Sequence, residues 1–255
     1  MFLVLVAACD SSPSLPPPSG EASKPASQVL ADAQAAMAQV HSYRVSSTNE
    51  FKDGTSSFSF SFDASGNLAG NIRTSGTSAD VVVVDAQPYI RGNEFWSRIY
   101  SGSGIAPAQM QTILGRIGVH YVHDPNDVLS LVSDARQLLP ANTPDCMGVH
   151  GKLTSGGTEI LNGQRVVVVN DDGTEPGGMP ARYLIADASP HRLLSAESHG
   201  PQTLGQQAAS GRCPAGTNVT PDLVDASRRT TFTFSQFDTV DPIRKPADTV
   251  EIAAG

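Results

Sequence analysis

The feature of this sequence that most limits its fold is a strict alternation of serine and phenylalanine from Ser57 to Phe62. Successive side chains of a β-strand point to opposite faces of a sheet, so the three Phe share one face and the three Ser the other. The turn signal Asp53-Gly54 precedes the stretch, and Ala64-Ser65-Gly66-Asn67 follows it. The pattern therefore predicts a strand of an antiparallel meander with one apolar face.

Other segments with strand character extend this predicted sheet. The run Val81-Val82-Val83-Val84 is apolar on both faces, so we expect both of its faces to be covered. The aromatic pair Phe95-Trp96 lies in a segment that we interpret as the second strand of a hairpin. The predicted strands cover residues 43–51, 57–62, 68–74, 81–84, 88–91, 95–98, 159–161, 164–170, 181–186, 193–199 and 230–234.

Apolar residues at spacings of three and four predict three helices, over residues 27–41, 107–117 and 124–140. The element order is a helix, about six strands, two helices and about five strands, which is typical of the α+β class. We therefore expect a single domain over residues 27–255, in which helices lie on one face of an antiparallel sheet. An extended tail is expected from Asp241 onward.

The N-terminal residues form an apolar run that ends in Val6-Ala7-Ala8-Cys9. This ending resembles the lipobox of bacterial lipoproteins, in which the cysteine thiol receives a diacylglyceryl group. The run is too short to span a bilayer, which takes about 20 residues, and no Lys or Arg precedes it. We interpret residues 1–8 as the remnant of a signal peptide, and residues 9–26 as the lipidated Cys9 followed by a disordered Ser/Pro tether. The alternative is a buried strand that carries a cysteine.

The other two cysteines, Cys146 and Cys213, lie in segments rich in Pro, Gly and Asp. An exported protein occupies a compartment in which disulfides persist, so we expect these two residues to form a disulfide bond. The alternative is that they are two unrelated buried thiols.

Several classes of function lack support in the sequence. The net charge is −8 and no basic cluster is present, which argues against nucleic-acid binding. No nucleophile motif, phosphate-binding loop or dinucleotide fingerprint occurs, so we expect neither catalysis nor a cofactor. His120, His123 and Asp124 could begin a metal site, but no second cluster of ligands stands out, and a loop before a helix explains them better.

Several short motifs together suggest a family. They are the lipobox, the Ser/Pro tether, the pair of central helices and the segments Ser42-Tyr43-Arg44-Val45, Pro88-Tyr89-Ile90-Arg91 with Phe95-Trp96, Asn162-Gly163-Gln164 and Phe234-Ser235-Gln236-Phe237. In this combination the chain resembles the LppX/LprA/LprF/LprG group of mycobacterial lipid-carrier lipoproteins and, more distantly, the LolA/LolB carriers. The resemblance implies a curved antiparallel half-barrel of about ten or eleven strands that wraps around helices and encloses an apolar cavity for acyl chains.

A cavity of that kind needs more apolar surface facing inward than the helices can fill. The candidates are Phe58, Phe60, Phe62, Val81, Val83 and Trp96 on the predicted sheet, and Met110, Ile113, Leu114, Leu129 and Val132 on the predicted helices. The sequence leaves two functions open. One is a membrane-anchored lipoprotein that carries lipids or glycolipids; the other is an envelope scaffold of the same fold with a filled core and no ligand. In both cases we expect an exported monomer, anchored through Cys9 to the extracytoplasmic face of the cell membrane.

Overall fold

The computed structural model describes residues 20–74, 76–101, 106–124, 151–175, 178–201 and 226–251. Several expectations lie outside these residues and stay predictions. They concern lipidation of Cys9, the Cys146–Cys213 disulfide, the helix after Asp124, and the cavity candidates Leu129 and Val132.

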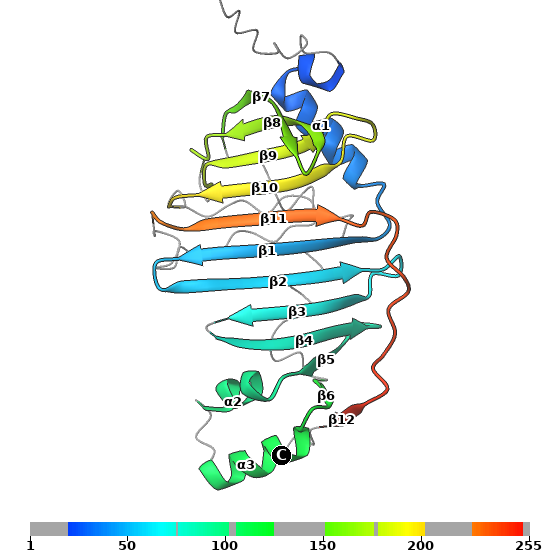
Figure 1. Ribbon diagram of the computed structural model, residues 1–255, viewed down its shortest axis with the longest axis vertical. Helices are drawn as coiled ribbons and strands as arrows, with labels where there is room; N and C mark the ends of the chain where they lie inside the picture. The colour runs from blue at the N-terminus through cyan, green and yellow to red at the C-terminus, as the bar shows by residue number, and fades with distance from the viewer. Residues whose placement is uncertain are drawn as a thin grey trace, which may run out of the picture.

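The described residues form one sheet of twelve strands in the order β12-β6-β5-β4-β3-β2-β1-β11-β10-β9-β8-β7 (Figure 1). All neighbouring strands are antiparallel except β6 and β12, which are parallel. The strands are β1 (Tyr43–Phe51), β2 (Gly54–Phe62), β3 (Leu68–Thr74), β4 (Thr77–Val84), β5 (Gln87–Arg91), β6 (Tyr121–His123), β7 (Leu153–Leu161), β8 (Gln164–Asp171), β9 (Ala181–Ala186), β10 (Leu193–His199), β11 (Arg229–Ser235) and β12 (Thr249–Glu251).

Two meanders meet at the middle of this sheet. Strands β1 to β5 follow one another as hairpins, and β7 to β10 do the same in the second half of the chain. Strand β11 joins the halves because it pairs with both β10 and β1, with Val45 opposite Phe234. The sheet is curved. It is also open, because β7 and β12 form two separate edges that do not pair with each other. The α+β fold class expected from the sequence is confirmed.

The helices lie toward the two ends of the sheet (Figure 1). Helix α1 (Ala26–Met37), preceded by the 3-10 helix η1 (Gly20–Ser23), packs on β7 to β10. Helices α2 (Asn93–Ser101) and α3 (Pro107–Ile117) contact each other, and α2 also packs on β4. No helix in the described part of the chain is long and apolar enough to cross a membrane.

The three α-helices of the described residues cover the same face of the sheet. Residues of one strand that are two positions apart share a face, and so do directly paired residues of neighbouring strands. By this rule Val45, Phe60, Val81 and Ile90 point to one side. Helix α1 packs into the apolar cluster that contains the first three, and α2 and α3 into the cluster that contains Ile90. We call this side the helix-covered face.

The segment around Phe95 and Trp96 is not the strand that we expected. It forms helix α2, whose first turn closes with a hydrogen bond from the Trp96 amide to the Gly92 carbonyl at 3.0 Å. Both aromatic side chains are buried against Ala79 and Ile90. The run is only four residues long, and aromatic residues favour strands, but a run of that length does not distinguish a strand from a helix.

Two short strands, β6 and β12, are not predicted from the sequence. The first lies where we expected a loop, and the second lies within the expected extended tail. Before reaching β12, the chain after β11 runs along the ends of the central strands (Figure 1). The amide of Asp238 donates to the Ser42 carbonyl at 2.7 Å, and the amide of Ile243 donates to Asp63 Oδ2 at 2.8 Å. The tail is therefore fastened to the sheet by long-range hydrogen bonds.

Candidate functional site

The helix-covered face between the two groups of helices is the candidate site. Strands β11, β1, β2 and β3 cross this part of the sheet, and α1 and α2 pack mainly on the strands to either side of them. We call it the central stretch, and it comprises the side chains of Val45, Ser47, Phe58, Phe60, Ile72, Thr230 and Phe232, together with Gly70.

Aromatic side chains dominate the central stretch. The rings of Phe58 and Phe60 stack with centroids 5.0 Å apart, and Phe58 meets Phe232 edge to face at 6.2 Å. Phe60 is buried, whereas Phe58 and Phe232 are only partly buried. Ile72 contacts both apolar clusters. The apolar surface is therefore continuous between the helix groups and is least covered at Phe58 and Phe232.

Packing is tighter at one end of β1. The ring of Tyr43 is fully buried between Phe62 and Phe234, with centroid distances of 5.4 and 6.0 Å. At the other end the same face becomes more polar. Arg228 lies 5.7 Å over the ring of Phe51. The character of the apolar face therefore changes along β1, from tightly packed and aromatic near Tyr43 to more polar near Phe51.

Two hydroxyl groups interrupt the apolar face near that polar end. Ser47 and Thr230 are 2% and 6% exposed, and neither side-chain oxygen has a hydrogen-bond partner among the described residues. A buried hydroxyl without a partner costs free energy, so these two positions are not optimised for stability alone. Neither position can be identified from the sequence, because a serine or threonine in a strand carries no sign of which face will be buried.

The structure separates the described cavity candidates into two groups. Phe58, Phe60, Phe62, Val81 and Val83 share the helix-covered face, as the period-two pattern predicts. Phe62 and Val81 have no exposed surface, so the core around them is solid. The remaining described candidates lie on helices at the α2–α3 end of the sheet: Trp96, Met110, Ile113 and Leu114.

Trp96 was assigned to the sheet, and this assignment is wrong. The residue lies on α2, where it is 4% exposed and its indole nitrogen donates to the Ile90 carbonyl at 3.4 Å. On α3, Ile113 and Leu114 pack against the cluster that contains Trp96, and Met110 is half-buried. Trp96, Ile113 and Leu114 therefore belong to the packing of α2 and α3 on the sheet.

Two hollows lined by described residues lie away from the central stretch. One, of about 420 Å³, is lined by polar and small residues that include Asp80, Arg91 and Gly92. The other, of about 350 Å³, is lined by residues of the β7–β8 and β9–β10 turns and the end of β11. None of the predicted cavity residues lines either hollow.

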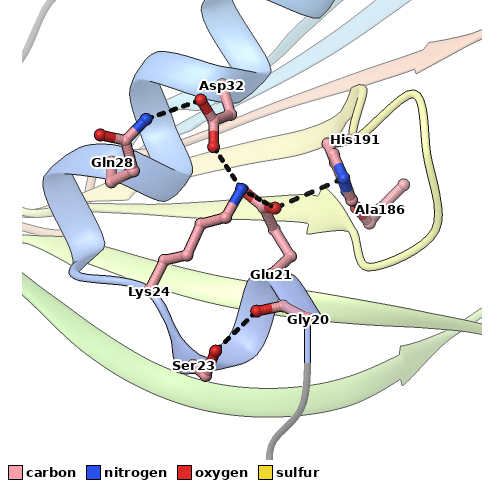
Figure 2. A network of polar contacts seen from close by, with 8 residues as sticks. All are labelled: Gly20, Glu21, Ser23, Lys24, Gln28, Asp32, Ala186 and His191. Atoms are coloured by element: carbon pink, nitrogen blue, oxygen red, sulfur yellow. Dashed lines mark hydrogen bonds and ion pairs between the residues drawn. The ribbon is translucent and has the colours of Figure 1, made fainter.

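A polar network fastens the start of α1 to the β9–β10 turn (Figure 2). The Glu21 side chain is 1% exposed, and its Oε2 lies 2.6 Å from Lys24 Nζ and 3.4 Å from His191 Nε2. Lys24 also donates a hydrogen bond to Asp32 at 2.6 Å, and this bond lowers the pKa of Asp32. The hydrogen bonds of Lys24 to Asp32 and Glu21 raise the pKa of Lys24. Residues 20–26, which the sequence predicts to be part of the tether, form η1, a short connection and the first residue of α1.

His120 and His123, the two histidines considered as metal ligands, each lie beside a carboxylate. His120 Nδ1 lies 2.5 Å from Asp248 Oδ1, and His123 Nδ1 lies 2.8 Å from Glu251 Oε2. Both contacts connect β6 and its flank to the chain at β12. No group of three or more potential ligands occurs among the described residues. The pairs therefore serve to hold β12 in place.

This architecture, one open and mainly antiparallel sheet with the described helices on one face, defines the chain as an α+β protein. It has the fold of LprF from Mycobacterium bovis, with a TM-score of 0.50 and 16% identity over 87% of this chain and 97% of that one. The resemblance to the LppX/LprF group is thus confirmed at the level of the fold.

More distant matches include the lipoprotein LppX from Mycobacterium tuberculosis, at 12% identity over 86% of this chain and 98% of that one, with a TM-score of 0.35. A LolA-superfamily protein from Nitrosomonas europaea matches at 8% identity over 87% and 96% of the two chains, with a TM-score of 0.26. No family model matches the sequence, and no curated protein matches it either.

Proposed function

We propose that this protein is a non-catalytic lipoprotein of the cell envelope that binds or carries lipids or glycolipids on its helix-covered face. The observation that carries the proposal is the continuous apolar surface of the central stretch, with Phe58 and Phe232 only partly buried. Acyl chains bind by burial of apolar area, at about 25 cal/mol per Å², and need no reactive group. The fold match agrees with this, since LprF belongs to the lipid-carrier group that the sequence resembles.

The second candidate is an envelope scaffold of the same fold that binds no ligand. The full burial of Phe62 and Val81 favours it, because a core that is filled at these positions leaves no room there for an acyl chain. The two functions differ in one measurable property, the uptake of lipid.

Native mass spectrometry of the purified protein tests the proposal, together with titration by a fluorescent fatty acid. We expect co-purifying lipid and saturable uptake. Phe58→Glu should weaken uptake at least about tenfold, because a carboxylate then faces the acyl chain in an apolar environment. Ser57→Glu, on the opposite face of the same strand, is the matched control and should bind as the wild type does. Absence of lipid and of uptake in the wild type would favour the scaffold.

The membrane anchor is tested separately. In a chain with a complete signal peptide, Cys9→Ser should move the protein from the membrane fraction to the soluble fraction, because the two acyl chains of a diacylglyceryl group supply the attachment. Cell fractionation followed by immunodetection measures this. Cys146→Ser is the control and should remain with the membranes. A Cys9→Ser protein that still sediments with membranes would show that the anchor lies elsewhere.

A further inference from the structure

We propose that the hollow at the β7–β8 and β9–β10 turns is a binding site for a neutral saccharide, separate from the lipid-binding face. Its volume of about 350 Å³ lies at the small end of the range for ligand pockets. Residues from two hairpin turns and from the end of β11 converge there, so segments distant in sequence build one concave surface.

The polar side chains of this hollow are exposed, so a ligand there would replace water as their hydrogen-bond partner. Five neutral polar residues line it, and none of their side chains bonds to another described residue: Asn162, Gln164, Ser189, Thr233 and Ser235. Each amide or hydroxyl side chain can both donate and accept. Sugar hydroxyls have the same dual character, so a saccharide matches this set better than an anion or a cation.

The charge of the hollow is balanced. Arg192 is the one charged residue of its lining, and its guanidinium lies 2.6 Å from Asp238 Oδ2 and 4.9 Å over the Phe237 ring. An anionic ligand would have to compete with Asp238 for this cation. The pairing therefore favours a ligand without net charge.

Apolar side chains complete the walls. Leu161, Pro190, Leu194 and Phe237 line the hollow beside the polar groups. A sugar ring presents C–H groups on its faces and hydroxyls at its edge, and a pocket with apolar walls and a few placed polar groups fits that distribution. Thr233 and Ser235 point away from the helix-covered face, since Phe232 and Phe234 on the same strand point toward it. These two polar groups of the saccharide site therefore lie on the opposite face of β11 from the lipid-binding surface, while Phe234 of the helix-covered face also lines the hollow.

The test is an NMR titration of the isotope-labelled protein with the methyl glycosides of glucose, galactose, mannose, arabinose and N-acetylglucosamine. For at least one glycoside we expect saturable shifts at the amides of Gln164, Thr233 and Ser235. The double variant Gln164→Ala/Thr233→Val should bind that glycoside about tenfold more weakly, because it lacks two hydrogen-bonding groups. Thr231→Val, two residues away on the same face of β11, is the control and should leave binding unchanged.

Three results would overturn the proposal. The first is the absence of saturable shifts with every glycoside. The second is equal binding by the wild type and the double variant. The third is an equal response of the same amides to glycerol, which would mean an unspecific polyol effect. Lipid uptake is measured on the same samples, so failure of the saccharide site and failure of the lipid-binding function are read separately.

Discussion

Replacing Gly70 with alanine is expected to destabilise the protein by at least about 3 kcal/mol, which is a large effect for the addition of one methyl group. Gly70 pairs with Phe60 across β2 and β3 on the helix-covered face. A Cβ at this position would lie 1.9 Å from the Ser59 carbonyl oxygen and 2.8 Å from Phe60 Cδ1. The nearer atom belongs to the backbone of the neighbouring strand, so the clash is relieved only if the two strands separate.

Urea unfolding followed by circular dichroism measures this loss. Gly115→Ala is the matched control, because Gly115 lies in α3 with no atom within 4 Å of its added Cβ. Alanine is favoured over glycine within a helix, so the control should gain about 0.5–1 kcal/mol. A Gly70→Ala protein as stable as the wild type would mean that β2 and β3 are farther apart than the structure places them.

Gly70 also bears on the proposed function. With no side chain at this position, the ring of Phe60 lies over the backbone of β3 and stacks on Phe58 at 5.0 Å. A residue with a side chain here would displace the ring from the middle of the central stretch. We therefore expect Gly70→Ala to reduce lipid uptake as well as stability.

The second large effect is expected for Asp63→Ala, at about 3–5 kcal/mol. Asp63 is 3% exposed, and its carboxylate accepts hydrogen bonds from the amides of Ser65, Asn67 and Ile243 and from the side chain of Asn67. Removing the carboxylate leaves these donors unpaired in a partly buried site. The bond to Ile243 joins the β2–β3 turn to the chain that leads to β12, so its loss should also loosen that chain.

Thermal unfolding and limited proteolysis measure the two consequences for Asp63→Ala. We expect a lower Tm and faster cleavage within residues 239–248. Asp53→Ala is the matched control, because Asp53 occupies the β1–β2 turn and is exposed. Its effect should stay within about 0.5 kcal/mol, with no change in cleavage. Unchanged proteolysis in Asp63→Ala would show that the tail is held by its other contacts.

Much of the fold follows from local patterns. The predicted boundaries of residues 43–51, 68–74, 107–117, 181–186 and 193–199 coincide with β1, β3, α3, β9 and β10. Turn signals such as Asp53-Gly54 and Asn162-Gly163 mark hairpins that the structure contains. These predictions succeed because the period of apolar residues reflects the backbone geometry of a single element.

The predictions that the structure contradicts all involve contacts between distant parts of the chain. Strands β6 and β12 are three residues each, and β12 forms by pairing with a strand more than 120 residues earlier in the chain, with Val250 opposite Val122. Trp96 was placed on a strand since nothing local shows that Ala79 and Ile90 form the surface on which α2 packs. Glu21 reads as part of a polar tether, yet Lys24 and His191 hold it in a buried position.

The sequence by itself determined which side chains of each strand share a face, because alternation is a property of one extended backbone. It thereby determined that Phe58, Phe60 and Phe62 lie on one apolar surface. Only the tertiary structure decided how that surface is covered: Phe62 lies within a solid core, whereas Phe58 stays partly exposed in the central stretch. The difference depends on where α1, α2 and α3 pack on a sheet joined by the β1–β11 pair, and those contacts connect residues far apart in the chain.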